Sequence, residues 1–113
     1  NHLISIMSQL HLPANPTLAD YQKYVRELVI ERGFETNLPE AFQLLMEECG
    51  ELAKAARKQS KMKTDINKDN DQNAAVEAAD VFIFLLDICN QLGVNLEQAF
   101  RAKEEINKTR VWK

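Results

Sequence analysis

Two acidic motifs in this sequence could do chemistry: EECGE at residues 47–51 and EAAD at residues 77–80. Each motif lies in an otherwise apolar, alanine-rich stretch. Residues three apart lie on one face of an α-helix, with their Cβ atoms about 5–6 Å apart. The spacing therefore predicts two carboxylate pairs, Glu48 with Glu51 and Glu77 with Asp80.

Neither motif contains a basic residue that could neutralise its carboxylates. If a helical bundle brings the two pairs together, each like-charge contact at about 4 Å costs about 1–4 kcal/mol, depending on screening by water. A positive charge must offset this cost, and a divalent cation is the natural candidate. Taken one at a time, the same residues are better explained as a solvated helix face, so the prediction depends on the whole set.

Asp80 weakens the explanation as a solvated face. It lies between Ala79 and Val81 in the most hydrophobic segment of the chain, where an ionised carboxylate is rarely left unpaired. Small residues beside both motifs, including Gly50 and Ala78, are expected to let two helices approach closely. Carboxylates from both helices could then reach one ion.

The ligand types indicate which cation would bind. Carboxylate oxygens suit Mg²⁺ or Mn²⁺, whereas zinc prefers cysteine and histidine. A di-iron bundle would need Glu-x-x-His motifs, but both histidines, His2 and His11, lie far from either acidic motif. Cys49 and Cys89 lack metal-binding spacing and are expected to be buried free thiols. We therefore expect Mg²⁺, with Mn²⁺ as the alternative.

Four helices are expected to position these motifs, and no alternating strand pattern appears. Capping residues and glycine stops place the helices at about 17–33, 37–59, 73–92 and from 95 onward. The third helix is apolar nearly all round, so it must be enclosed on most sides. One small chain cannot readily enclose it, so its second apolar face is expected to meet another copy. The predicted fold is all-α, of the four-helix-bundle type, and is completed by homo-oligomerisation.

The chain is predicted to be one helical domain, residues 17–113, preceded by an N-terminal arm, residues 1–16, that is helical or extended. A polar segment at residues 60–72 is expected to form a solvated loop between the acidic motifs. The chain has 113 residues, 45% of them hydrophobic, and a net charge of −3. These values argue against binding to nucleic acid, and no apolar run is long enough for a membrane span. We expect a cytoplasmic protein.

The order of three segments carries a family resemblance: EECGELAKA at 47–55, EAADVFIFLLDI at 77–88 and KEEINKTR at 103–110. It resembles the MazG-like nucleoside triphosphate pyrophosphohydrolases, members of the all-α NTP pyrophosphatase superfamily. Their signature is EExxE, a variable gap and ExxD. The resemblance spans about residues 17–112.

The resemblance implies a dimer or tetramer that hydrolyses nucleoside triphosphates, including non-canonical dNTPs, to the monophosphate and pyrophosphate, as house-cleaning of the nucleotide pool. It also implies that the matching carboxylates hold Mg²⁺: Glu48, Glu51, Glu77 and Asp80. Glu47 or Glu48 would be the general base, and the spacing does not decide between them. The alternative is a non-catalytic metal- or nucleotide-binding module of the same fold that serves regulation or oligomerisation.

Basic residues near the motifs are candidates for binding the triphosphate. Lys54 and Lys58 follow Glu51 by three and seven residues, although solvated lysines are an equally good explanation. Lys103, Asn107 and Arg110 recur at i, i+4 and i+7, which predicts one face of the last helix, and they match the basic tail of the family. Two aromatic residues are candidates for stacking on a nucleobase, although packing in a core or an interface is their commoner role: Trp112 and Phe34.

Overall fold

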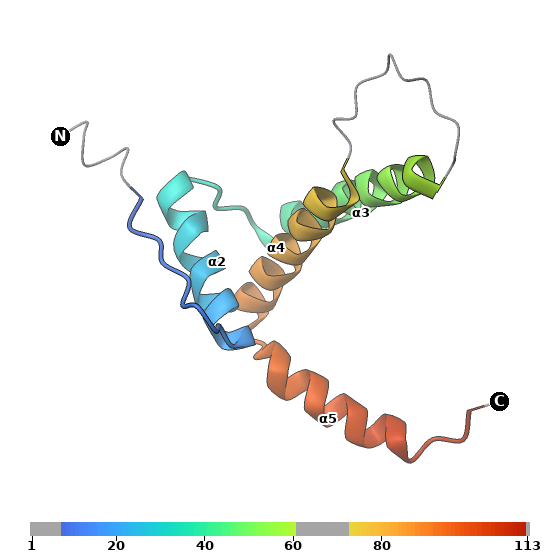
Figure 1. The fold of residues 1–113 in the computed structure, drawn as a ribbon. Helices are drawn as coiled ribbons and strands as arrows, with labels where there is room; N and C mark the ends of the chain where they lie inside the picture. The colour runs from blue at the N-terminus through green and yellow to red at the C-terminus, as the bar shows by residue number, and fades with distance from the viewer. Residues whose placement is uncertain (1–7, 61–72, 113) are drawn as a thin grey trace. The chain divides into compact units, whose positions relative to one another are not determined.

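The computed structural model describes residues 8–60 and 73–112 of the chain (Figure 1). Within these residues the structure is all-α and has no strand, which confirms the predicted fold class. It contains four helices, α2 (Leu18–Arg32), α3 (Leu38–Ser60), α4 (Ala74–Leu92) and α5 (Leu96–Lys108). The predicted loop at 60–72 lies outside the described residues except for Ser60, which ends α3.

Local side-chain chemistry starts the helices where the sequence predicts. At the start of α2 the Asp20 backbone N–H donates to the Thr17 hydroxyl at 3.1 Å, and the Thr17 N–H donates to the Asp20 carboxylate at 2.8 Å. Asn37 and Glu40 make the same reciprocal pair at the start of α3, at 2.8 and 3.0 Å. These bonds satisfy backbone donors that have no partner inside the helix.

Two glycines end α2 and α4. Gly33 and Gly93 have φ angles of 68° and 70°, in the left-handed region that glycine enters without a steric penalty. After each glycine the chain donates a backbone hydrogen bond back to the helix, from Phe34 to Val29 at 2.9 Å and from Val94 to Cys89 at 2.8 Å. The predicted stops are therefore confirmed.

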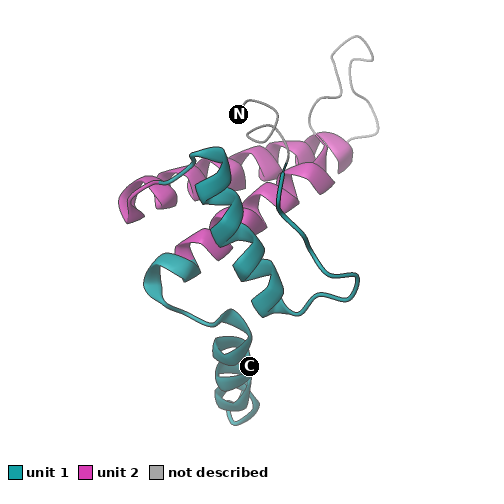
Figure 2. Cartoon of the chain, turned by 90° about the vertical axis from the view of Figure 1, so that its left-hand side faces the viewer, with its two compact units in different colours: residues 1–35, 89–113 teal, residues 36–88 magenta. Residues whose placement is uncertain are grey.

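The chain forms two compact units, residues 36–88 and residues 1–35 with 89–113 (Figure 2). The first unit contains α3 and most of α4, which lie side by side. The second contains α2, the last turn of α4 and α5, and in it α2 contacts α5. The described part of the N-terminal arm, residues 8–16, contains no helix, and Ser8 and Gln9 both donate hydrogen bonds to the Glu31 carboxylate.

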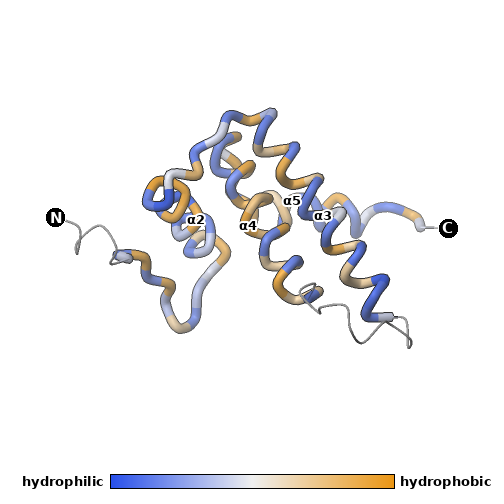
Figure 3. The backbone as a smooth tube through the Cα atoms, turned by 90° about the horizontal axis from the view of Figure 1, so that it is seen from above, coloured by the Kyte–Doolittle hydropathy of each residue, from blue (hydrophilic) through white to orange (hydrophobic). Residues whose placement is uncertain are grey.

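Hydrophobic residues recur in short runs along the helices (Figure 3), but a single copy buries few of them. On α4 the buried residues are confined to 86–89, whereas Val76 and Leu85 are exposed. No residue of α5 is buried. The expected enclosure of the third helix is therefore only partly achieved within one chain. Of the two free thiols, Cys89 is buried as expected and Cys49 is only half-buried.

Candidate metal centre

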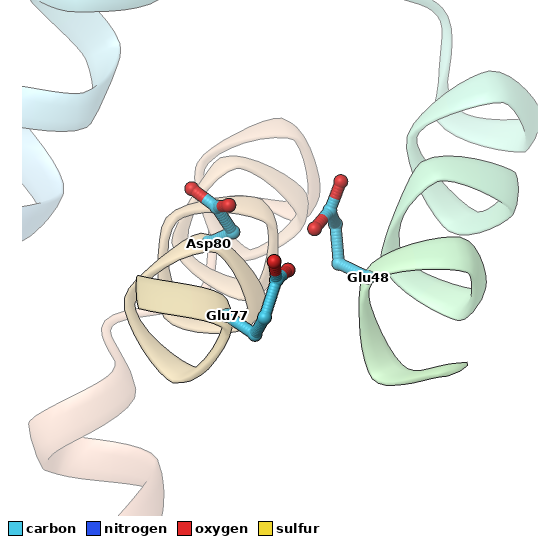
Figure 4. Close-up of side chains that lie close together, drawn as sticks. All are labelled: Glu48, Glu77 and Asp80. Carbon is cyan, nitrogen blue, oxygen red and sulfur yellow. The ribbon is translucent and has the colours of Figure 1, made fainter. Parts of the chain in front are cut away.

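Three carboxylates converge between α3 and α4 within the unit of residues 36–88. Glu48 projects from α3, and Glu77 and Asp80 project from the first turns of α4 (Figure 4). One carboxylate oxygen from each residue lies within 4.8 Å of the other two, and all three residues are half-buried. All the converging atoms are oxygens, so this donor set fits a hard divalent cation.

The start of α4 positions two of the three carboxylates. The Asn73 side chain accepts a hydrogen bond from the Ala75 N–H at 2.8 Å, and the Asn73 carbonyl accepts from Glu77 at 3.0 Å. This arrangement places Glu77 in the first turn, where the partial positive charge of the helix N-terminus favours an anion. Asp80 follows three residues later and therefore faces the same way.

The grouping raises the pKa of Glu48 above the ordinary glutamate range. The largest cause is burial, followed by the negative charge of Asp80 and a hydrogen bond between the Glu48 and Glu77 side chains. The charges of Glu77 and Glu51 add to the shift. Each of these effects favours the protonated form of Glu48. A bound cation would favour the ionised form instead, because it would replace repulsion by attraction.

The fourth predicted ligand, Glu51, does not belong to this three-residue group. Its side chain is exposed, one turn along α3 from Glu48, and its charge still contributes to the raised pKa of Glu48. The predicted general-base candidate Glu47 is also exposed. Adjacent residues on a helix project about 100° apart, so Glu47 leaves α3 in a different direction from Glu48.

The expectation that small residues allow a close helix approach is wrong at Gly50. A Cβ atom added there would meet no atom of the described residues within 4 Å, and Gly50 is exposed. Ala78 is exposed as well. The carboxylates therefore meet through the length of their own side chains and not through glycine-mediated contact of the two backbones.

The two lysines of α3 that are predicted to bind phosphate differ in their exposure. Lys54 is exposed and Lys58, in the last turn of α3, is half-buried. Two ion pairs on α5 join Arg101 with Glu97 and Lys108 with Glu105, and neither pair involves a lysine of α3.

The predicted row on the last helix is only partly correct. Lys103 and Asn107 lie one turn apart on α5, in the unit of residues 1–35 and 89–113. α5 ends at Lys108, however, and Thr109 caps it with a backbone hydrogen bond to Ile106 at 3.1 Å. Arg110 therefore lies beyond the helix, and the i+7 position does not continue its face.

A buried glutamine that the sequence analysis did not select holds the start of α5. The Gln22 side-chain amide donates to the Asn90 side chain at 3.0 Å and to the Val94 carbonyl at 2.8 Å, and its oxygen accepts from the Leu96 N–H at 3.0 Å. The Asn90 side-chain amide in turn donates to the backbone carbonyl of Gln22 at 2.9 Å. The available signal was the position of Gln22 on the apolar stripe of α2, three residues before the buried Val25.

The described residues contain no helix with both the length and the apolar character that a membrane span requires. The family described as "Phosphoribosyl-ATP pyrophosphohydrolase" matches residues 18–107. No individually curated protein is significantly similar to the chain in sequence.

Two solved structures are similar over most of their length. One is the cyanophage S-2L MazG-like pyrophosphohydrolase bound to dGDP and three catalytic Mn²⁺ ions per active site. It is 30% identical, with 88% of each chain covered and a TM-score of 0.64. The other is iMazG from Vibrio DAT 722, which is 27% identical and has a TM-score of 0.63; the match covers 86% of this chain and 99% of that one.

Proposed function

This chain belongs to the family of MazG-like all-α pyrophosphohydrolases, and we propose from this membership the reaction that it catalyses. Membership makes it a nucleotide pyrophosphohydrolase of the metal-binding kind. The finer proposal is the Mg²⁺-dependent hydrolysis of nucleoside triphosphates, including non-canonical dNTPs, to the monophosphate and pyrophosphate. The nucleotide pool of the cytoplasm would be its place of action.

The observation that carries this proposal is the group of Glu48, Glu77 and Asp80, whose oxygens lie within 4.8 Å of one another. The related cyanophage enzyme holds Mn²⁺ ions and a nucleotide in its active site. We therefore assign the group to the metal, with Mg²⁺ as the expected ion and Mn²⁺ as the alternative. Glu51 is proposed as the fourth ligand, which requires its exposed side chain to turn toward Glu48.

The proposed reaction is the attack of water on the α-phosphorus of the triphosphate. A bound divalent cation would supply charge neutralisation for the phosphate oxygens. Glu47 or Glu48 takes a proton from the attacking water while the water oxygen forms its bond to the α-phosphorus. The bond from the α-phosphorus to the bridging oxygen then breaks, and pyrophosphate leaves with the electron pair of that bond.

Basic and amide side chains are proposed to bind the triphosphate. Lys54 and Lys58 would act from α3, which also carries Glu48. Lys103, Asn107 and Arg110 would act from α5 and the segment after it. At present the Asn107 amide donates to Glu104 at 3.1 Å, so contact with a phosphate requires this amide to exchange partners.

Self-association as a dimer or tetramer is part of the proposal. Large hydrophobic residues remain exposed on α2, α4 and α5 in the single chain, among them Ile30, Leu92, Phe100 and Ile106. Exposed apolar surface of this extent is typical of surfaces that bind another protein. A second copy of the chain would bury it.

The test is a panel of ordinary and modified ribo- and deoxyribonucleoside triphosphates, together with phosphoribosyl-ATP because the matching family carries that name. Purified protein with Mg²⁺ should release pyrophosphate and the monophosphate from at least one compound. Glu35→Gln is a matched control, because Glu35 is exposed and does not belong to the acidic group. Binding of Mn²⁺ without any hydrolysis would instead support the non-catalytic module.

A further inference from the structure

The segment after α5 folds back on the end of the helix. We call residues 109–112 the C-terminal hook. The Asn107 carbonyl accepts two hydrogen bonds from it, from the Arg110 backbone N–H at 3.1 Å and from the Trp112 indole Nε1–H at 3.3 Å. The hook therefore fixes the only tryptophan of the chain by the polar edge of its ring.

The indole ring itself remains in solvent, since Trp112 is 69% exposed. The Arg110 guanidinium carbon lies over the ring at 6.0 Å from its centroid, a cation–π distance that favours this orientation of the ring. An exposure of this size means that most of the ring is not covered by the described residues. Tryptophan is enriched at binding surfaces, where its flat apolar body and its N–H can both meet a partner, so this uncovered ring is a candidate binding surface.

The surroundings of the ring favour a ligand that has both a flat apolar part and an anionic part. Arg110 is part of the hook, Asn107 accepts a hydrogen bond from Trp112, and Lys103 lies one turn before Asn107 on α5. The Asn107 side-chain oxygen is shielded from solvent and has no hydrogen-bond partner among the described residues. The amide nitrogen of the same side chain donates to Glu104 at 3.1 Å, so only the oxygen is left to accept a hydrogen bond from a ligand.

The other exposed aromatic residue lacks these features. Phe34 is 59% exposed and follows the glycine that ends α2, but its ring has no polar edge and the described residues place no cation over it. Both aromatic residues lie outside the core of the single chain, so of the two commoner roles core packing is wrong for each and packing in an interface stays a prediction. Trp112 is the better candidate for binding a base.

We propose that Trp112 is the nucleobase platform of this enzyme: a purine base of the substrate nucleotide stacks on the indole, and Arg110 and Asn107 contact the rest of the nucleotide. The proposal rests on the proposed function, because it assumes a nucleotide substrate. Stacking on an aromatic ring accepts any base, and the larger ring system of a purine gains more contact than a pyrimidine does.

Because the chain has one tryptophan, its fluorescence reports on this site alone. The 113-residue chain is titrated with dGDP, dCDP and pyrophosphate, and free N-acetyltryptophanamide corrects for light absorbed by the nucleotides. The expected result is a saturable change with dGDP, a weaker response to dCDP and none with pyrophosphate, which lacks a base. Equal changes with dGDP and pyrophosphate would overturn the proposal. A fluorescence signal that depends on protein concentration and not on nucleotide concentration would also overturn it, because the ring would then lie in an interface between copies.

Three variants complete the test, with dGDP affinity measured by calorimetry. Trp112→Ala should bind dGDP about tenfold more weakly and leave pyrophosphate binding unchanged, whereas Trp112→Phe keeps a ring and should stay within about threefold of wild type. Val111→Ala is the matched control, because Val111 is 84% exposed in the same hook, and its dGDP affinity should not change. Unaltered dGDP affinity in Trp112→Ala would overturn the proposal. If no triphosphate is hydrolysed but dGDP still changes the fluorescence, the proposed reaction fails and the platform stands.

Discussion

The acidic group and the Gln22 network are two polar clusters built in opposite ways. Around Gln22, a buried amide meets partners of complementary polarity at 2.8–3.0 Å. Around Glu48, like charges meet one another and raise a pKa. A satisfied network stabilises the fold because no buried polar group loses its partner. A cluster of like charges needs a ligand of opposite charge to become satisfied, which is the role proposed for the metal at the acidic group.

The largest expected effect is the loss of catalysis when the acidic group loses one carboxylate. Asp80→Asn keeps the shape of the side chain but removes a charge on which the proposed metal site depends. The kcat/KM for the best triphosphate of the panel should fall about a thousandfold, equivalent to about 4 kcal/mol of transition-state stabilisation. Steady-state pyrophosphate release measures this change, and Glu35→Gln should remain within about twofold of wild type. Less than a tenfold loss in Asp80→Asn would remove the acidic group from the mechanism.

Disrupting the Gln22 network should lower the stability of the fold and is not expected to act through the chemistry of the acidic group. Gln22→Leu leaves the Val94 carbonyl and the Leu96 N–H without their partner, and each unsatisfied buried group costs about 1–3 kcal/mol. The free energy of unfolding, measured by urea denaturation, should fall by about 2–4 kcal/mol. Gln43→Leu on the exposed surface of α3 is the control and should change it by less than about 0.5 kcal/mol. Equal effects of the two substitutions would show that the network contributes no stability.

In the metal-free protein, removing a charge from the acidic group should raise the free energy of unfolding, whereas Gln22→Leu lowers it. The pKa of Glu48 is raised in the folded state, so its contribution to stability is complete below the unfolded glutamate pKa. That contribution is lost as the pH rises through the folded pKa. The metal-free wild type should therefore lose stability relative to Glu48→Gln as the pH rises above the ordinary glutamate pKa of about 4.3. The carboxylates are only half-buried, so screening keeps the difference below about 1 kcal/mol.

Added metal should reverse the order of these two proteins. Mg²⁺ should stabilise the wild type by mass action, by about 2.7 kcal/mol at a hundred times its dissociation constant, and Glu48→Gln should lack most of this increment. Thermal unfolding at several pH values, with EDTA and then with Mg²⁺, measures both effects. A wild type that is indifferent to millimolar Mg²⁺ and parallels Glu48→Gln across the pH range would contradict the electrostatic account.

Local chemistry explains what could be predicted from the sequence. The Thr17 and Asn37 caps and the Gly33 stop depend on residues within a few positions of one another, so their spacing was sufficient. The pairing of Glu77 with Asp80 also follows from one helix turn. The end of α5 at Lys108 was not predictable from the periodicity, because the i+7 spacing of Arg110 continues past the point where the helix stops.

Contacts between distant segments explain what the sequence could not predict. The partners of Gln22 lie 68, 72 and 74 residues away, and no local pattern pairs a glutamine of α2 with the turn before α5. The membership of Glu51 in the acidic group depends on side-chain reach, which spacing does not determine. Gly50 was expected where two helices approach closely, because a small residue allows close contact. A small residue does not by itself bring two helices together, and a Cβ atom added at this position would meet no atom of the described residues within 4 Å.

The smallest expected effect belongs to a third arrangement, in which opposite charges meet in solvent. Arg101 and Glu97 form an ion pair at 3.0 Å on α5, with side chains 76% and 43% exposed. Water already satisfies both charges, so the pair adds little. Arg101→Ala should lower the free energy of unfolding by about 0.2–0.5 kcal/mol, and the loss should shrink as salt is added in urea denaturation. A loss near that of Gln22→Leu would mean that partner complementarity, and not burial, sets the stability of polar contacts in this fold.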